Sequence, residues 1–318
     1  MLDAYARPRL SRSLLDLGTS ALPYLGLLVA IYFSLQVSVI VALALALPAA
    51  GFLTRTFIVF HDCTHGSFLP TRRGNSLLGA ALGILVWLPF RSWQHEHAVH
   101  HATAGDLDRR GIGDISTLTV DEYRAMGRWR RLGYRLFRHP VVMFGLGWML
   151  VLVLKPRLVP RGSSKRIRNS ILGTNLTLAV LVAGACLVLG WGSFLLVQGP
   201  TLVITGVVGI WLFYVQHQFE DAYWEAHEHW RYDQAALQGS SYLKLPRVLQ
   251  FFTGNIGFHH IHHLSARIPN YNLQAAHEET SHAMGVPELS LRDGLKATRL
   301  KLWDDQRRRL VTFREANA

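Results

Sequence analysis

Three short stretches of this sequence place several histidines at helical spacing. They are His61–His65 (HDCTH), His97–His101 (HAVHH) and His259–His263 (HHIHH). Positions i, i+3 and i+4 lie on one face of an α-helix, so each stretch would present two or three imidazoles on one side. Imidazole nitrogens bind Zn, Cu, Fe and Ni, and packed polar groups without partners are costly. Three such clusters beside long apolar runs therefore predict a multi-histidine metal site.

Helical spacing also separates candidate ligands from the other histidines. The residues that share a face within their own stretch are His61, His65, His97, His100, His101, His259, His262 and His263. His95 and His260 fall off these faces, which favours a surface or supporting role. His227 and His229 point to different helix faces, so we interpret them as part of a solvated surface.

Apolar runs long enough to cross a bilayer flank the histidine clusters. A spanning helix takes about 20 apolar residues, and such runs lie at about 17–35, 37–54, 171–189 and 194–215. The breaks between the paired runs are short, so the four runs form two hairpins. The sequence thus predicts an all-α, multi-pass integral membrane protein in which residues 1–318 form one domain, with every histidine cluster on the same side.

Two further apolar segments, 77–88 and 141–154, are shorter than a span. Segments of this length suit re-entrant or interfacial positions, and the sequence does not decide between the two. If neither segment crosses, the first two clusters stay on one side of the membrane. The polar part of the chain after Leu264 is expected to form helices that, with the clusters, build a cap over the site.

The formal net charge of +12 fits a membrane protein better than a nucleic-acid-binding one. Six basic residues without an intervening acid lie between the second and third long runs: Lys155, Arg157, Arg161, Lys165, Arg166 and Arg168. Such a loop is typical of the cytoplasmic face. Cys63 lies inside a histidine cluster and Cys186 in an apolar run, so no disulfide is expected. The active site is therefore predicted on the cytoplasmic side.

The three histidine motifs, with the residues around them, resemble the histidine boxes of the membrane fatty acid desaturase family. The sequence in and around the motifs is most similar to that of the omega-6, or acyl-lipid, branch of the family. The supporting segments are DLDRRGIGD at 106–114, GNIGF at 254–258 and IPNYNL at 268–273. The resemblance covers about residues 20 to 280, and the three motifs together are specific.

This resemblance implies a non-haem centre of two iron ions with O₂ as cosubstrate. The family's eight box histidines match the eight candidates named above, and His217, where the fourth run ends, is the natural additional ligand. Asn255 is expected to face the metals directly or through water. The implied partners are a fatty acyl lipid, acyl-CoA or acyl carrier protein as substrate, and a ferredoxin-like or cytochrome b5-like electron donor.

Five carboxylates near the motifs are candidates for orienting the imidazole rings from outside the metal shell. They are Asp62, Glu96, Asp106, Asp114 and Glu220. Ordinary surface salt bridges are an equally good interpretation of each one.

The chemistry predicted from this resemblance is insertion of a cis double bond into a long acyl chain. The rival within the same class of site is a hydroxylase or ketolase of lipids, carotenoids or alkanes. A membrane haem electron carrier would need histidine pairs facing each other across spans, and a metal transporter would need a charged path across them. The histidines lie outside the spans, which disfavours both.

Overall fold

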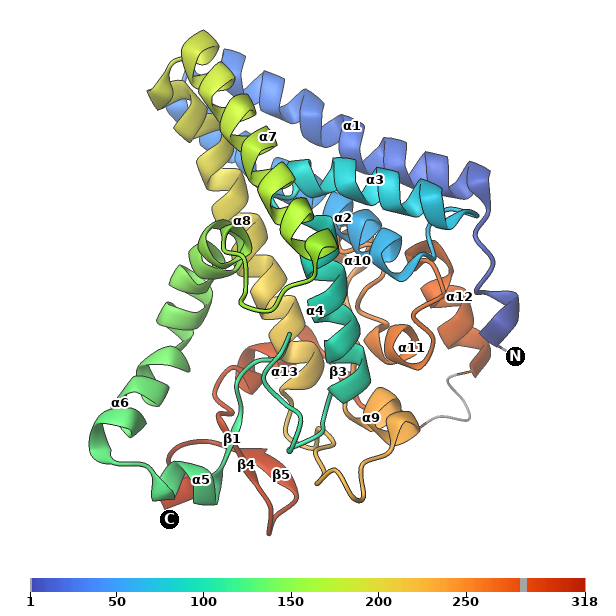
Figure 1. The fold of residues 1–318 in the computed structure, drawn as a ribbon, viewed down its shortest axis with the longest axis vertical. Coiled ribbons are helices and arrows are strands. Elements are labelled where there is room, and N and C mark those ends of the chain that lie inside the picture. Colours follow the sequence, from blue (N-terminus) through green and yellow to red (C-terminus); the bar gives the residue numbers. More distant parts are fainter. Residues whose placement is uncertain (1, 281–284, 318) are drawn as a thin grey trace.

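Four helices of 25 to 27 residues form the frame of the molecule. They are α1 (Leu10–Ser34), α2 (Val39–His65), α7 (Lys165–Leu189) and α8 (Trp191–His217). The computed structural model describes residues 2–280 and 285–317. Each of the four helices is long and apolar enough to cross a membrane, which confirms a multi-pass membrane protein built on two helical hairpins (Figure 1).

The helices extend beyond the apolar runs that predicted them. α1 begins at Leu10 instead of residue 17, and α2 continues without a break through the first histidine motif to His65. A helix of 27 residues is about 40 Å long, which exceeds the hydrocarbon thickness of about 30 Å. The carboxyl-terminal turns of α2 and α8 can therefore carry histidines past the apolar layer.

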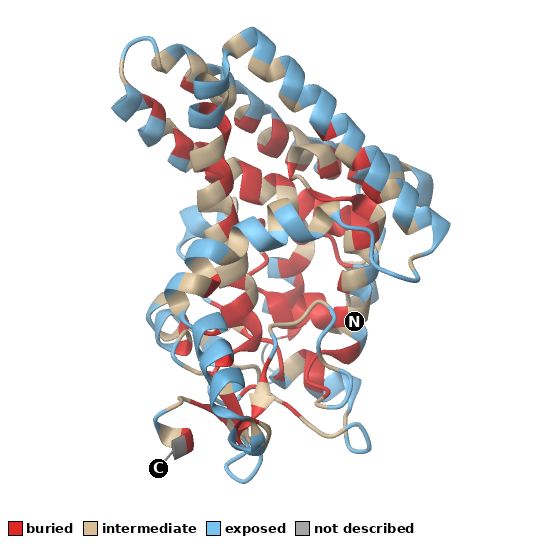
Figure 2. Ribbon diagram, turned by 60° about the vertical axis from the view of Figure 1, so that its left-hand side comes forward, coloured by how far each residue is buried: buried red, intermediate tan, exposed pale blue. Residues whose placement is uncertain are grey.

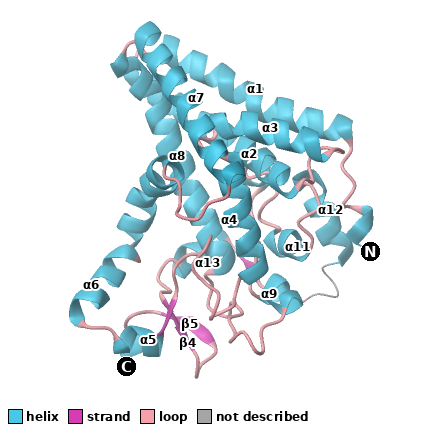
Figure 3. Cartoon of the chain, viewed as in Figure 1, coloured by secondary structure: helices cyan, strands magenta, loops and turns pink. Residues whose placement is uncertain are grey.

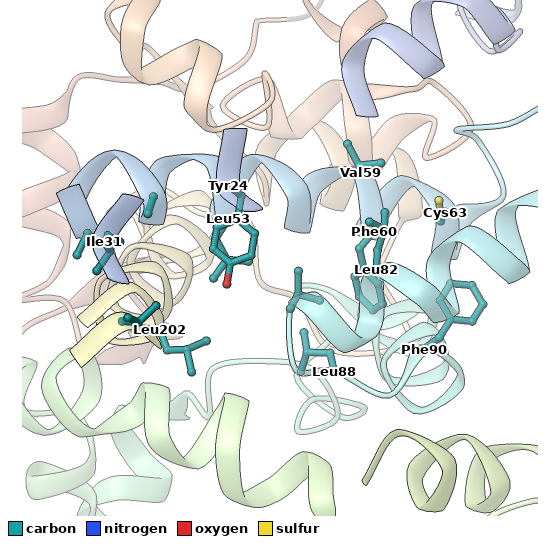
Figure 4. Packing of buried hydrophobic residues seen from close by; sticks show 14 of the residues in the cluster. Tyr24, Ile31, Leu53, Val59, Phe60, Cys63, Leu82, Leu88, Phe90 and Leu202 are labelled. Atoms are coloured by element: carbon teal, nitrogen blue, oxygen red, sulfur yellow. The ribbon is translucent and has the colours of Figure 1, made fainter. Parts of the chain in front are cut away.

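The two hairpins pack against each other mainly through α2 and α8. On α2, the small side chains of Ala42, Ala46 and Ala49 are buried, which allows neighbouring helices to approach closely. Larger side chains fill the rest of the core, among them Tyr24 of α1 and Phe60 of α2 (Figure 4). By contrast, the outer faces of the long helices are exposed (Figure 2). Many of the side chains exposed there are large and apolar, among them Leu22, Ile40, Val180 and Leu187. This distribution suits contact with lipid.

Two shorter helices, α3 (Arg72–Leu85) and α4 (Phe90–Thr103), meet at a bend of 103°. The corner is tight, because Trp87 has a φ of 62° and a Cβ on Gly83 would lie 2.5 Å from the carbonyl oxygen of Leu88. The predicted short segment 77–88 is thus the end of α3 and the corner itself. The bend turns α4 toward the carboxyl end of α2 and so brings the second motif beside the first.

A second bent pair follows α5 (Val120–Ala125). Helix α6 (Arg128–Phe137) meets the helical segment Val141–Arg157 at 61°. This segment consists of η2 (Val141–Leu146) and η3 (Met149–Leu154), which are π-helical, and η4 (Lys155–Arg157). It packs on α8, where a Cβ on Gly206 would lie 2.4 Å from the Cβ of Trp148. The predicted segment 141–154 is therefore helical and lies against a spanning helix.

The carboxyl-terminal part was expected to be helical, and the structure corrects this in part (Figure 3). Up to Leu264 this part contains α9 (Tyr232–Gln238), α10 (Arg247–Phe252) and α11 (His259–Leu264). After Leu264, where helices were expected, α12 (Asn270–Thr280) and α13 (Leu291–Ala297) are accompanied by short strands. β2 (Tyr242–Leu243) pairs with β3 (Glu288–Leu289), and β4 (Leu302–Asp304) pairs with β1 (Leu118–Thr119) and β5 (Arg309–Val311). The ends of the chain add the 3₁₀ turns η1 (Leu2–Ala4) and η6 (Glu315–Asn317).

The β4–β5 hairpin has a local cause that the sequence reading overlooked. Asp304 accepts hydrogen bonds from the backbone N–H groups of Gln306 and Arg307, and Arg308 takes a φ of 54°. Asp side chains favour such turns. Trp303 and Leu310 are paired across the two strands, and both side chains are buried. Burial of this apolar pair stabilises the hairpin against the rest of the protein.

We expect the turns Leu35–Ser38 and near Gly190 to lie outside the cell, with both termini and the three motifs in the cytoplasm. A single cysteine at Ser163 should then resist an impermeant thiol reagent in intact cells, whereas one at Ser193 should react. The physical reason is the basic 155–168 loop, which stays on the cytoplasmic side. Labelling of Ser163→Cys from outside would show that the Val141–Arg157 segment crosses the membrane.

Candidate metal centre

Nine buried or half-buried histidines from four helices converge in two groups. The five-histidine group contains His61, His65, His97, His101 and His262, and the four-histidine group contains His100, His217, His259 and His263. In each group the nitrogens that could bind a metal all lie within 4.8 Å of one another. All nine residues are the ones that the sequence singled out. The structure adds how they divide between two sites.

Helix α4 contributes to both groups. His97 and His101, four residues apart, point to the five-histidine group, and His100 points to the four-histidine group. The helical face predicted from their spacing is thus broad enough to border two sites. Trp93, one turn before His97, stacks on its imidazole with ring centroids 4.3 Å apart. This contact supports the ring from the apolar side.

Helix α11 divides its histidines in the opposite way. His262 joins the five-histidine group, whereas His259 and His263 join the four-histidine group. His217 enters the same group from the last residue of α8. Because α4 and α11 each serve both groups, the two sites are adjacent parts of one centre.

The nitrogen separations fit ligands around a cation. In the five-histidine group the Nε2 atoms of His61 and His97 are 2.9 Å apart, those of His97 and His101 are 3.1 Å apart, and those of His101 and His262 are 2.9 Å apart. Neighbouring ligands at right angles with bonds of about 2.1 Å would be about 3 Å apart. In the described part of the chain, the buried Nε2 of His65 has no hydrogen-bond partner. Such an orphaned nitrogen is what a metal ligand looks like without its ion.

The four-histidine group shows the same pattern. The Nε2 atom of His217 lies 3.1 Å from that of His100 and 2.9 Å from that of His259. The buried Nε2 of His263 is unpaired among the described residues. Burial and neighbouring imidazoles hold the pKa values of His259 and His263 well below the usual range, so these rings are neutral and their lone pairs are free to bind a cation.

Three groups hold ligand rings from outside. A carboxylate oxygen of Asp114 is hydrogen-bonded to Nδ1 of His100, and the carbonyl oxygen of Gly239 accepts a hydrogen bond of 3.0 Å from Nδ1 of His217. Oδ1 of Asp62 lies 3.2 Å from Nδ1 of His61. Each contact leaves the Nε2 atom of its ring for the metal side, as expected for supported metal ligands.

Asp62 is itself held by a buried network that the sequence reading missed. Its other oxygen accepts hydrogen bonds of 2.7 and 3.0 Å from the backbone and side chain of Asn270 at the start of α12. The same amide donates to Asp16 of α1 at 2.9 Å, and Asp16 forms an ion pair with Arg55 of α2. A lone acid beside a predicted span was a usable signal for Asp16. The role of Asn270 depends on packing that the sequence does not display.

The remaining predicted carboxylates, Glu96, Asp106 and Glu220, form ion pairs with residues other than the nine histidines. Glu96 pairs with Lys155 at 2.7 Å, and Glu220 pairs with Arg309 at 2.5 Å. Asp106 pairs with Arg109 at 2.6 Å and lies 2.8 Å from Nδ1 of His227. These contacts agree with the interpretation of the three carboxylates as ordinary salt-bridge partners.

Asn255 also has other partners. Its amide oxygen accepts a hydrogen bond of 3.1 Å from Gln250, and its amide nitrogen donates one of 3.1 Å to the carbonyl of Asn270. With a φ of 59°, Asn255 shapes the turn before α11. Both polar atoms of the Asn255 amide thus have protein partners.

Among the described residues, the other histidines lie outside the two groups. His95 and His229 are exposed, and the side chain of His227 is 54% exposed. His260 is buried, and its Nε2 lies 3.0 Å from Nδ1 of His277 on α12. This contact joins α11 to the helix that begins at Asn270.

Fold and site together define a class of protein: a multi-pass membrane protein whose candidate metal ligands are histidines near the ends of its helices. Comparison with known proteins then narrows the class. The model of the family described as "Fatty acid desaturase" matches residues 37–293 and so includes all three motifs. The chain is 49% identical to the fatty acid desaturase of Bacillus subtilis (strain 168), over 98% of this chain and 88% of that protein. The chain belongs to the fatty acid desaturase family, and it is an O₂-dependent oxidoreductase acting on fatty acyl groups.

More distant relatives are similar over most of the chain. An sn-1 oleoyl-lipid 12-desaturase of Synechocystis sp. is 28% identical over 83% of this chain and 73% of that protein. The chloroplastic omega-6 fatty acid desaturase of Spinacia oleracea is 24% identical over 73% of this chain and 52% of that protein. These matches agree with the predicted resemblance to the omega-6 and acyl-lipid branch.

We expect Asp62→Asn to lower desaturation by about 10- to 100-fold, which is milder than loss of a metal ligand. The amide would weaken the support of His61 and set an N–H group against the donors of Asn270. Product formation per unit of purified enzyme is the measurement, and Asp221→Asn, at an exposed position, is the matched control. Equal activity of Asp62→Asn and Asp221→Asn would show that the network does not support the centre.

Proposed function

We propose that the protein inserts a cis double bond into a long fatty acyl chain, using O₂ and electrons from a separate donor protein. The observation that carries this proposal is the pair of adjacent, buried, all-histidine groups on a membrane-spanning frame. General acid–base groups cannot remove hydrogen from an unactivated methylene, because its C–H bond is not acidic. When bound, two iron ions with O₂ supply the oxidising power for that step.

The nine histidines are the proposed iron ligands, with one ion in each group. The neutral rings donate Nε2 lone pairs, and Asp62, Asp114 and the carbonyl of Gly239 fix the ring orientation through Nδ1. Phe213 lies beside His100, with ring centroids 5.0 Å apart, and it supplies an apolar wall together with Trp93. These side chains place apolar surface against the imidazoles, which disfavours water at those faces.

The proposed substrate is an acyl chain that enters from the membrane. Two of the relatives are named for acting on oleoyl groups in lipids, which favours an acyl lipid over acyl-CoA or acyl carrier protein. The proposed donor is an acidic ferredoxin-like or cytochrome b5-like protein on the cytoplasmic side. The net charge of +12 supports this pairing, since complementary charge speeds encounter and salt slows it.

Replacement of one proposed ligand in each group, in the variants His262→Ala and His100→Ala, should abolish desaturation and reduce bound iron. The wild-type protein should carry one iron per group, two per chain. Elemental analysis of the purified protein measures the metal independently of activity. His229→Ala, at an exposed position outside both groups, should keep full iron and activity. A wild-type stoichiometry of one iron, or normal iron in both ligand variants, would contradict the assignment.

Expression in a host without such enzymes, fed with saturated or monounsaturated fatty acids, tests the reaction itself. Mass spectrometry should show a new acid lighter by two hydrogens, absent without O₂ and absent with His262→Ala. Fractionation of lipids, CoA esters and carrier-bound acids before analysis identifies the acyl carrier. A main product heavier by one oxygen would instead make the enzyme a hydroxylase on the same centre.

A further inference from the structure

Helix α6 presents its apolar side to the outside. Trp129, Leu132, Leu136 and Phe137 recur at helical spacing on one face, and they are 71%, 45%, 54% and 42% exposed. In a helix of a soluble domain this stripe would face the core. Here four large apolar side chains on less than three turns are left without protein cover, which marks an interaction site.

The opposite face of α6 is polar and attached to the rest of the protein. Tyr134 and Arg138, four residues apart, are buried there. The hydroxyl of Tyr134 donates a hydrogen bond of 2.8 Å to the carbonyl of Lys301, and Arg138 donates to the carbonyl of Ser116 at 2.7 Å and to the side chain of Gln218 at 2.8 Å. These bonds fix the rotation of α6, so its apolar face cannot turn inward.

Arginines border the apolar face on both sides. By helical spacing Arg128 follows one edge and Arg130 follows the other, and both are exposed. Arg135 lies on the same edge as Arg128, but its Nε donates a hydrogen bond of 2.6 Å to the hydroxyl of Tyr123, so its guanidinium is bound to the protein. An apolar stripe with a basic border is the pattern of a helix that lies in the headgroup layer of a membrane. The positive charges match anionic lipid headgroups.

The apolar face also continues into a surface that fits the bilayer. The next helical segment exposes Val141 (69%), Leu146 (56%) and Leu150 (53%), and it packs on the spanning helix α8. Figure 1 shows α6 projecting from the side of the α7–α8 hairpin. We propose that α6 lies in the headgroup layer of an anionic leaflet, with Trp129, Leu132, Leu136 and Phe137 in the lipid and Arg128 and Arg130 on the headgroups. An acidic soluble protein would match the arginines and leave the apolar stripe in water.

Site-directed spin labels on the full-length protein test the proposal. Cys186→Ser removes the more accessible cysteine, Cys63 being buried, and Leu132→Cys carries the nitroxide. The protein is placed in nanodiscs of phosphatidylcholine, with or without phosphatidylglycerol. The expected result with phosphatidylglycerol is high accessibility to O₂ and low accessibility to a water-soluble nickel chelate. Without it, accessibility to the nickel chelate should rise several-fold.

Two reference positions calibrate the signal. Leu181→Cys on α7 gives the value for lipid, and Gln306→Cys in the exposed β4–β5 turn gives the value for water. The variant Arg128→Gln/Arg130→Gln should remove the difference between the two lipid mixtures while its metal content stays normal. A label at 132 that behaves like the one at 306 in both mixtures would overturn the proposal. So would a label at 132 that becomes protected only when an acidic electron-donor protein is added, because the face would then be a protein-docking surface.

Discussion

Mutual facing of the imidazole nitrogens is the constraint on which the rest of the structure depends. Two neutral rings about 3 Å apart can share one proton only if one of the two facing nitrogens carries it. Nδ1 of His217 holds its proton for the carbonyl of Gly239 and Nδ1 of His100 holds its proton for Asp114, so the Nε2 atoms of these rings are two lone pairs that face each other at 3.1 Å. The unpaired Nε2 atoms of His65 and His263 show this frustration among the described residues. Buried polar groups without partners cost about 1–3 kcal/mol each. A cation in each group removes the conflict, because every lone pair then points at positive charge.

The histidines come from four helices, so the fold must bring the ends of these helices together at one place. α2 and α8 must end on the same side, which the two hairpins ensure. α4 must turn back to meet them, and the close approach of Gly83 to the carbonyl of Leu88 allows that corner. α11 must begin close to α8, and the turn around Asn255 provides that start. The network from Arg55 through Asp16 and Asn270 to Asp62 then fastens α1, α2 and α12 together beside the centre.

The sequence was informative where one residue type or one period dominates. Histidines at i, i+3 and i+4 identified the candidate ligands, and the long apolar runs identified the spanning helices. Local patterns could not show that α4 and α11 divide their histidines between two groups, because that division depends on how the helices cross. They also could not separate Asp62 and Asp114, which contact ligand rings, from Glu96 and Glu220, which meet basic side chains distant in the chain. The same applies to α6, whose polar side is the buried one only because Tyr134 and Arg138 find partners there.

The direction in which the histidine-bearing helices approach the centre has an electrostatic consequence. His65 ends α2, His217 ends α8, and α4 carries His100 and His101 in its last turn. The carboxyl end of a helix carries a partial negative charge of about half an elementary charge, from carbonyl groups that lack intrahelical partners. Three such ends, of α2, α4 and α8, turn toward a ligand set that is itself neutral. Peptide dipoles, with the nearby carboxylates of Asp62 and Asp114, thus provide negative potential where two multiply charged cations would sit. The backbone supplies part of the charge balance that other metal centres obtain from carboxylate ligands.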